Sequence, residues 1–290
     1  MSTAAIADAP SRGGIRAVTE AEAAFFAEHG WVHLPGLVAP DLCQAMLERG
    51  RPEIDRAETP AGIWSMPTED LLAKMGEAAA GGGDVVTEIG QWVEWRGAIR
   101  ALHEPAFTRV GLDPVMGHNA QALLGRRHQV QVYHDMFVCK RPDGVSTATG
   151  WHQDFGHYPF DRNSLTFWIA LAEITPDMGP VRFLSCSHKM GMFGRIDPLN
   201  QVDLIDEYPE LDSLEKSSAW HMRPGDCTVH NAMTIHGAGA NLRSDPRWSY
   251  ICTYFPTDSR YNGMPSHDAD GYGFKVGFPM DHPTFPKVPL

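Results

Sequence analysis

The chain has 290 residues, of which 43% are hydrophobic and 21% charged, and its formal net charge is −12 at pH 7. These values are those of a globular protein that buries a sizeable core. The excess of acidic side chains argues against a nucleic-acid partner, because phosphate binding requires clustered lysine and arginine. The sequence contains no apolar run long enough for a membrane-spanning helix, so we expect no membrane span.

The N-terminal residues 1–16 are small and polar, without the apolar stretch of a secretory signal. We expect them to form a disordered tail before a single domain over residues 17–290. Five cysteines are scattered along the chain, and their odd number and lack of CxxC spacing predict reduced thiols and a cytoplasmic location. The oligomeric state stays open between a monomer and a homodimer.

Capping and turn residues predict the first elements of the domain. Thr19 and Glu22 form a capping box, which predicts the start of a helix. A short strand is expected over residues 30–37, and Pro40 is expected to open a second helix. Residues 51–90 carry no regular pattern and are expected to be irregular.

The rest of the chain divides into a helical part and a strand-rich part. Residues 98–124 are helical in tendency and predict two short helices packed against a sheet. From Val130 onward strands dominate, with proline and glycine at their turns. Residues 262–290 are rich in glycine, proline and histidine, and are expected to form an ordered tail or a lid.

An HxD motif at His152 and Asp154, with His236 lying 84 residues after His152, is the most informative feature. Two imidazoles and one carboxylate form the facial triad that holds non-haem Fe(II) on one side and leaves the other side open. Residues i and i+2 of a strand point the same way, so both ligands of the motif would reach one metal while Gln153 faces away.

The HxD pair alone is weak, because the chain has 14 histidines and an ordinary hydrogen-bonded pair at a loop edge is an equal alternative. The downstream context favours the metal. Residues 224–236 predict a tight turn and then an extended run rich in β-branched residues that ends on His236. A glycine-rich corner over residues 237–241 follows.

Arg247 opens a predicted strand over residues 247–254, and Ser249 shares its face. A guanidinium fork suits a buried carboxylate because it donates two parallel, charge-assisted hydrogen bonds. Standing alone, Arg247 would be a surface arginine on an edge strand. Beside a facial triad it fits the distal carboxylate of 2-oxoglutarate, with Ser249 as a second donor.

The ordered set of motifs resembles the phytanoyl-CoA dioxygenase (PhyH) family of Fe(II)/2-oxoglutarate-dependent oxygenases. The resemblance is strongest from about residue 130 to residue 255 and is carried by five segments: His134–Pro142, Trp151–Phe160, Leu165–Leu171, Met178–Pro180 with Ser185–Lys189, and His236–Arg247. It implies Fe(II), 2-oxoglutarate and O2 as the cofactor and co-substrates. It also implies a double-stranded β-helix (a cupin-like jelly roll) braced by N-terminal helices, where the residues alone predict only mixed α and β structure with strands in the second half.

Carried over by position, the resemblance implies a specific set of residues. The implied iron ligands are His152, Asp154 and His236. The implied 2-oxoglutarate contacts are Met136, Trp168 and Arg247, together with an upstream polar residue, for which Gln91 and Arg96 are the candidates. The chain departs from the family pattern at Ala238, where a co-substrate-binding serine is expected, and at Cys186, in a segment that is usually Pro-Gly-Ser-His.

The implied activity is the hydroxylation, or another oxidation, of an unactivated C–H bond in a small hydrophobic metabolite, in secondary metabolism. The carboxylate of Asp154 argues for oxygenation, because halogenases of this architecture have glycine or alanine there. No general base is needed, so no catalytic residue beyond the iron ligands is expected. Candidates for an apolar pocket, each more commonly a core residue, are Trp64, Met66, Trp92, Trp95, Phe137, Phe155 and Tyr158.

Two alternatives remain. One is an acyl-CoA hydroxylase, which a basic groove near Arg126 and Arg127 would favour. The other is a non-catalytic jelly-roll protein that retains the metal without turnover.

Overall fold

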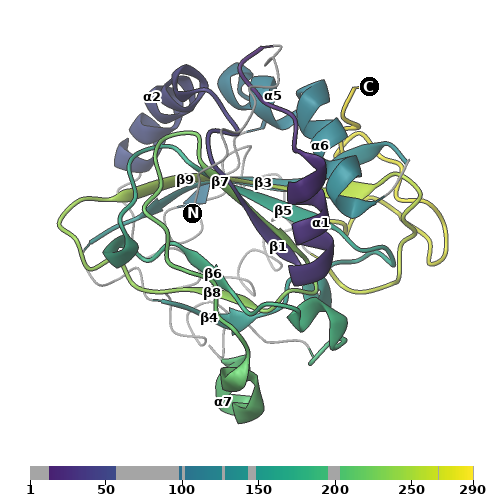
Figure 1. Ribbon diagram of the computed structural model, residues 1–290. Coiled ribbons are helices and arrows are strands. Elements are labelled where there is room, and N and C mark those ends of the chain that lie inside the picture. Colours follow the sequence, from purple (N-terminus) through teal and green to yellow (C-terminus); the bar gives the residue numbers. More distant parts are fainter. Residues whose placement is uncertain are drawn as a thin grey trace, which may run out of the picture.

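A computed structural model describes residues 13–56, 98–99, 102–125, 128–142, 148–194, 203–266 and 268–289. Within them, two antiparallel sheets face each other (Figure 1). The larger sheet has the strand order β1 (Trp31–Leu34), β7 (Cys227–Asn231), β5 (Leu165–Ala170), β9 (Arg247–Pro256), β3 (Val130–Lys140) and β2 (Ala98–Ile99). The smaller sheet has the order β4 (Thr149–His152), β8 (His236–Ala238) and β6 (Val181–Phe183). This is the jelly roll that was expected.

Helices cover the outer face of the larger sheet (Figure 1). These are α1 (Glu20–His29), α2 (Pro40–Arg56), α5 (Pro105–Gly111) and α6 (Pro114–Leu124). A short helix, α7 (Leu204–Glu207), lies beyond the smaller sheet. Single turns of 3₁₀ helix are η2 (Phe155–His157), η3 (Pro176–Met178), η4 (Ser187–Lys189) and η5 (Pro209–Ser213). The two short helices predicted before Val130 are therefore confirmed as α5 and α6, but the helical range expected from residue 98 is wrong at its start, where Ala98–Ile99 form β2.

The strands of the larger sheet separate two environments. On β9, Trp248 and Tyr250 point toward the helices and join the main hydrophobic core, where the Tyr250 ring packs 5.2 Å from that of Phe107. Arg247 and Ser249, one position out of phase, point toward the smaller sheet. Because the helices cover the other face, polar side chains for a site can only gather between the two sheets.

The first two helices begin where the sequence predicts. The Thr19 hydroxyl accepts a hydrogen bond from the Glu22 amide (3.2 Å), and the Glu22 carboxylate accepts one from the Thr19 amide (2.8 Å). Helix α2 begins at Pro40 but continues to Arg56, so the irregular structure expected from residue 51 is wrong for its first turns. Full burial of Ile54 in the core outweighs the amide hydrogen bond that Pro52 cannot donate.

The folded part begins before residue 17. Ile15 is 1% exposed and forms a β-bridge with Val38, and the Arg16 guanidinium pairs with Glu22 at 2.8 Å. The expected tail therefore does not include these two residues, while residues 1–12 lie outside the described ones. Apolar burial of Ile15 supplies the free energy that orders this segment.

At the other end, the segment that follows residue 262 is ordered, as expected. The Val132 amide donates to the Pro286 carbonyl and the Val288 amide to the Val130 carbonyl, both at 2.9 Å, so this segment lies along β3. None of the five cysteines lies in a disulfide. Among the described residues, no helix has the length and apolar character needed to cross a membrane.

Candidate metal centre

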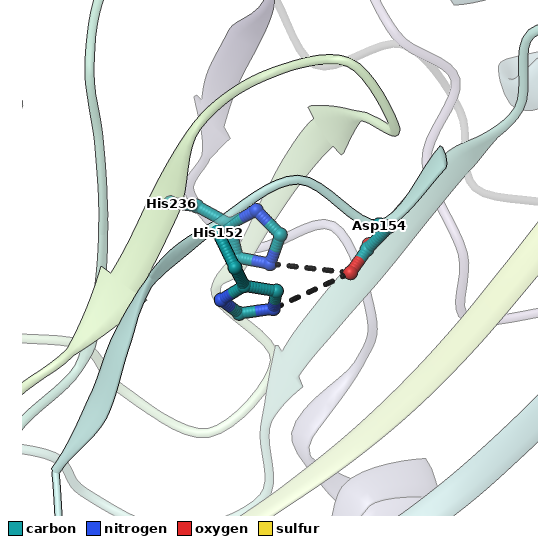
Figure 2. Close-up of side chains that lie close together, drawn as sticks. All are labelled: His152, Asp154 and His236. Carbon is teal, nitrogen blue, oxygen red and sulfur yellow. Dashed lines mark ion pairs between the residues drawn. The ribbon is translucent and has the colours of Figure 1, made fainter. Parts of the chain in front are cut away.

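Strands β4 and β8 bring the two predicted histidine ligands together. His152 is the last residue of β4 and pairs directly with His236, the first residue of β8. Their ring centroids lie 4.2 Å apart. Figure 2 shows both imidazoles turned toward Asp154. The 84-residue separation in sequence is closed by a single antiparallel strand pair.

Asp154 reaches the site from a turn and not from a strand, which corrects the expected geometry. Strand β4 ends at His152, and Asp154 has helical dihedral angles (φ −70°, ψ −37°). Its carbonyl accepts from the His157 amide at 2.9 Å, which opens the turn η2. The carboxylate Oδ1 nevertheless lies 3.5 Å from His152 Nε2 and 3.6 Å from His236 Nε2.

Gln153 points away from the site, as predicted, and fixes the turn from behind. Its side chain is 2% exposed and donates to the carbonyls of Gly191 (2.9 Å) and Met233 (2.7 Å). Its amide oxygen accepts from the Phe193 backbone at 2.9 Å. These three hydrogen bonds hold the HxD motif against two loops.

His236 does not end one long extended run, as the sequence suggested, because the run is divided into β7 and β8. At the end of β7, Asn231 accepts from the Met233 amide through its side chain and from the Thr234 amide through its carbonyl, both at 2.8 Å. An Asn side chain that caps its own turn in this way is a common chain reversal. The turn carries the chain from the larger sheet to the smaller one and points His236 between them.

Backbone carbonyls fix the tautomer of both ligand histidines. His152 Nδ1 lies 2.8 Å from the Gly150 carbonyl, and His236 Nδ1 lies 3.0 Å from the Thr234 carbonyl. Each Nδ1 must carry the proton to donate these hydrogen bonds, which leaves the lone pair of each Nε2 for a metal.

The three ligand atoms lie within 4.8 Å of one another, and among the described residues they are the group of three that could hold a metal ion. Ligand atoms at about 2.1 Å from one ion, at right angles, are about 3 Å apart. The observed Oδ1–Nε2 separations of 3.5 and 3.6 Å are therefore close to those of a loaded site. Two neutral imidazoles and a carboxylate form the donor set of non-haem Fe(II) oxygenases.

Burial and neighbouring groups shift the pKa values of the three candidate ligands differently. Burial alone would lower the pKa of His152, but its interactions with Asp154 outweigh burial and raise that pKa. Burial alone would raise the pKa of the Asp154 carboxyl, but the interactions of its two oxygens with His236, His152 and His230 outweigh burial and hold that pKa well below its usual value. Burial lowers the pKa of His236 well below its usual value. The carboxylate is therefore anionic and the His236 imidazole neutral at physiological pH.

Arg247 opens β9 as predicted, but it is deeply buried and not a surface residue. It is 4% exposed, and its guanidinium carbon lies 5.0 Å from the ring centre of Trp168. One terminal nitrogen donates to the carbonyl of Gly179, and Nε has no hydrogen-bond partner among the described residues. Burial lowers its pKa to about 10. At neutral pH a cation is thus buried here, and no carboxylate of the described part of the chain pairs with it.

Three neighbouring strands place the other predicted co-substrate contacts around Arg247. Ser249 is fully buried on the same face, and its hydroxyl has no hydrogen-bond partner among the described residues. Met136 on β3 and Trp168 on β5 both pair with Ile251 of β9 and flank this face. Gln91 and Arg96 lie outside the described residues, so the choice between them is untested.

Gly179 determines how closely the loops pack around Arg247. It has φ +66°, and a Cβ atom there would overlap the carbonyl oxygen of Gly239. Gly179→Ala should lower the free energy of unfolding by about 3 kcal/mol or more, from left-handed strain and a backbone clash together. Urea unfolding measures this. Gly239→Ala is the matched control, because its Cβ would lie 3.8 Å from Gly179, an ordinary contact. Equal loss in both variants would contradict the argument.

The departures from the family pattern have local consequences. Ala238 lies on β8 opposite Val181 and carries no hydroxyl toward the site. Cys186 has φ +65°, the left-handed conformation in which the family's glycine is unstrained, so here the side chain tolerates that strain. The adjacent Ser187 hydroxyl accepts from the Ile235 amide at 2.9 Å and so supports the residue before His236.

Of the predicted pocket residues, the structure describes three. Phe137 faces the helices and stacks on Trp248 in the main core, so its expected place in a pocket is wrong: its position on β3 points outward. Phe155 directly follows Asp154, and Tyr158 lies at the end of the turn η2 that begins there. Burial, together with the charge of Asp154, raises the pKa of Tyr158 well above its usual value, so it stays a neutral phenol beside the site. The others lie outside the described residues: Trp64, Met66, Trp92 and Trp95.

One residue that contacts the site was not among those predicted from the sequence. His230 on β7 is 3% exposed, and its Nε2 lies 3.1 Å from Asp154 Oδ2. The inward direction of its side chain could have been predicted, because His230 alternates along the strand with Val229, which faces the helices. The turn that brings Asp154 next to His230 could not have been predicted from the sequence.

Known proteins share the sequence pattern and the fold of this chain. The sequence profile of the phytanoyl-CoA dioxygenase (PhyH) family matches residues 26–249, well over half of the chain. Methylphosphonate hydroxylase of Gimesia maris is 30% identical over 135 residues, which are 47% of this chain and 48% of that protein. The chain thus matches about half the length of this curated relative.

Solved structures share the fold over nearly the whole chain. The epimerase SnoN, solved with Fe3+, α-ketoglutarate and nogalamycin RO, has 21% identity and a TM-score of 0.69, covering 93% of this chain and 98% of SnoN. The non-haem α-ketoglutarate-dependent carbocyclase SnoK, from nogalamycin biosynthesis, has 21% identity and a TM-score of 0.66, covering 96% and 100%. They confirm the jelly roll. The family expected from the ordered motifs is confirmed as well, and the chain belongs to the phytanoyl-CoA dioxygenase (PhyH) family.

Proposed function

We propose that this protein is an Fe(II)- and 2-oxoglutarate-dependent oxygenase that oxidises a C–H bond of a small hydrophobic metabolite, with O2 as the second co-substrate. The observation that carries the proposal is the buried guanidinium of Arg247, which has no carboxylate partner among the described residues and lies between the sheets that hold the three-ligand site. A buried, uncompensated cation is costly unless an anionic ligand neutralises it.

In this proposal His152, Asp154 and His236 hold the iron and leave a face open for the co-substrates. When bound, the iron with 2-oxoglutarate and O2 supplies the oxidant for an unactivated C–H bond. The protein binds, orients and keeps water away, so no general base is required.

Arg247 and Ser249 would bind the distal carboxylate of 2-oxoglutarate. The guanidinium Nε and the Ser249 hydroxyl are both buried donors that have no hydrogen-bond partner in the described part of the chain, and they lie on one face of β9. Trp168 and Met136 would contact the carbon chain of the keto acid. This set fits a short dicarboxylate, which needs a charged anchor at one end and apolar walls beside it.

The substrate class is inferred from the residues after the motif. Phe155 and the buried Tyr158 belong to one aromatic cluster, and Tyr158 lies close enough to Asp154 to feel its charge, which favours a largely apolar substrate beside the site. SnoK, which has the same fold, belongs to the biosynthesis of nogalamycin, and by analogy we infer a role in secondary metabolism. Five cysteines outside disulfides support a reducing, cytoplasmic setting. Arg126 and Arg127 lie outside the described residues, so no described feature favours an acyl-CoA substrate.

The proposal is tested by anaerobic titration of the apoprotein with Fe(II) and then 2-oxoglutarate. We expect one equivalent of each to bind and a weak visible charge-transfer band to form only when both are present. After O2 is admitted, succinate should accumulate. A protein that binds iron but develops no band and releases no succinate would fit the non-catalytic alternative and would refute the proposal.

A further inference from the structure

The two oxygens of the Asp154 carboxylate have different partners. Oδ1 faces the two ligand imidazoles, at 3.5 Å from His152 Nε2 and 3.6 Å from His236 Nε2. Oδ2 points the other way, to His230 Nε2 at 3.1 Å. The two contacts come from opposite sheets, since His236 lies on β8 and His230 on β7. The carboxylate is thus held between the smaller sheet and the larger one.

The ring of His230 has little freedom to move. It is 3% exposed, packs 4.1 Å from the ring of His236 and 5.4 Å from the ring of Phe183, and lies on a central stretch of β7. To donate to the carboxylate, Nε2 must carry the proton. Nδ1 is then a bare acceptor and has no hydrogen-bond partner among the described residues. The contact with Asp154 is therefore the polar interaction that the structure shows for this side chain.

We propose that His230 is a positioning residue that keeps Oδ2 of Asp154 in a hydrogen bond, so that the carboxylate binds the metal through Oδ1 alone. The proposal rests on the assignment of His152, Asp154 and His236 as ligands. A carboxylate can bind a metal through one oxygen or through both. A second oxygen on the metal would occupy a position that a chelating keto acid and O2 both require, so an N–H donor on Oδ2 keeps that face open.

Two other roles for His230 make different predictions. As a core histidine it would contribute only packing, and an apolar residue of similar size would replace it without effect on the metal. As a fourth metal ligand it would have to turn Nε2 from Oδ2 toward the metal. The 3.1 Å contact with Oδ2 and the packing against Phe183 oppose that movement.

The test compares three variants in anaerobic titrations with Fe(II), and with Co(II), whose visible absorption reports coordination number. His230→Leu keeps the volume and removes the donor. His230→Gln keeps an N–H donor near the place of Nε2, whereas the side chain of His230→Asn is too short to reach. The matched controls are His33→Leu and His33→Gln, because His33 lies on the neighbouring strand β1 and stacks on Trp220 at 4.8 Å, away from the ligands.

We expect His230→Leu and His230→Asn to raise the dissociation constant for Fe(II) by about 10- to 100-fold, the usual effect of losing an outer hydrogen bond to a ligand. In both, the Co(II) spectrum and the charge-transfer band with 2-oxoglutarate should shift. His230→Gln should stay within about threefold of wild type, with an unchanged spectrum. The His33 variants should change neither the dissociation constant for Fe(II) nor the spectra. If His230→Leu does not fold, His230→Asn and His230→Gln still compare the protein without and with an N–H donor to Oδ2.

The outcomes separate this inference from the proposed function. Wild-type protein that binds neither Fe(II) nor Co(II) would refute the proposed function. Normal metal binding and spectra in His230→Leu, with or without lower thermal stability, would overturn the positioning role alone. Loss of metal in His230→Gln as complete as in His236→Ala would also overturn it and would make His230 a ligand.

Discussion

Replacing His236 with alanine is expected to raise the dissociation constant for Fe(II) by about two orders of magnitude or more and to abolish turnover. The variant removes one of three ligand atoms that lie within 4.8 Å of one another. The two remaining atoms come from one short segment, His152 at the end of β4 and Asp154 in the turn that follows it, so they can no longer enclose the ion from two strands. Asp154→Ala should have a similar effect on iron retention, since it removes the anionic ligand.

Anaerobic Fe(II) titration and succinate release after O2 measure this loss. The control is His221→Ala, because His221 is an exposed histidine that pairs with Glu173 at 2.7 Å, away from the site. The apoprotein of His236→Ala should still fold, since the ligands are not needed to close the main core between the helices and the larger sheet. Iron binding equal to wild type in a folded His236→Ala variant would remove this residue from the ligand set.

The sequence predicted which side chains come together between the sheets better than it predicted their geometry. For the two histidines and Arg247, residue type and order along the chain were enough to predict their places, because each lies at the end of a strand that a short stretch of sequence indicates. The position of Asp154 depends on the turn η2, whose hydrogen bond to Ala232 joins residues far apart in sequence. Local patterns cannot show such a contact, and so they also missed His230, which meets Asp154 across the two sheets.

Helix α2 illustrates the same limit in the fold. Residues 51–90 were expected to be irregular, and Pro52 removes a backbone hydrogen bond there, yet the helix continues to Arg56. The segment is held by contacts with distant residues: Ile54 enters the core, and the Arg49 guanidinium bridges Glu53 and Glu104 at 2.7 and 2.8 Å. Tertiary packing of this kind routinely overrides helix propensity. It cannot be predicted from short stretches of a single sequence, because the contacting residues are far apart along the chain.

The second large effect is expected at Arg247, where binding and stability should change in opposite directions. Arg247→Met keeps the length of the side chain and removes the charge. We expect the dissociation constant for 2-oxoglutarate to rise by about 100-fold, the equivalent of roughly 3 kcal/mol for losing a charge-assisted, bidentate contact. Iron binding should stay near wild type, because Arg247 is not a ligand. Titration of the charge-transfer band gives both constants.

The stability of the apoprotein should increase in the same variant. Burial lowers the pKa of Arg247 to about 10, so at neutral pH the folded apoprotein holds a buried guanidinium cation that no carboxylate of the described ranges neutralises. Arg247→Met removes that cost and should raise the free energy of unfolding of the apoprotein by about 1–3 kcal/mol in urea. Arg182→Met is the control, since the Arg182 guanidinium donates to the Ser217 carbonyl at 2.9 Å and is not expected to contact the co-substrate.

Weaker binding of 2-oxoglutarate together with a more stable apoprotein is the combination that identifies Arg247 as a co-substrate anchor. An arginine kept for structure would lose stability on replacement, through its contacts with Gly179 and Trp168, and would leave 2-oxoglutarate binding unchanged. An anchor instead makes the empty protein less stable and is neutralised when the dianion binds, so that saturating 2-oxoglutarate should raise the melting temperature of wild type and not of Arg247→Met. A less stable Arg247→Met apoprotein that binds 2-oxoglutarate normally would refute this role for Arg247.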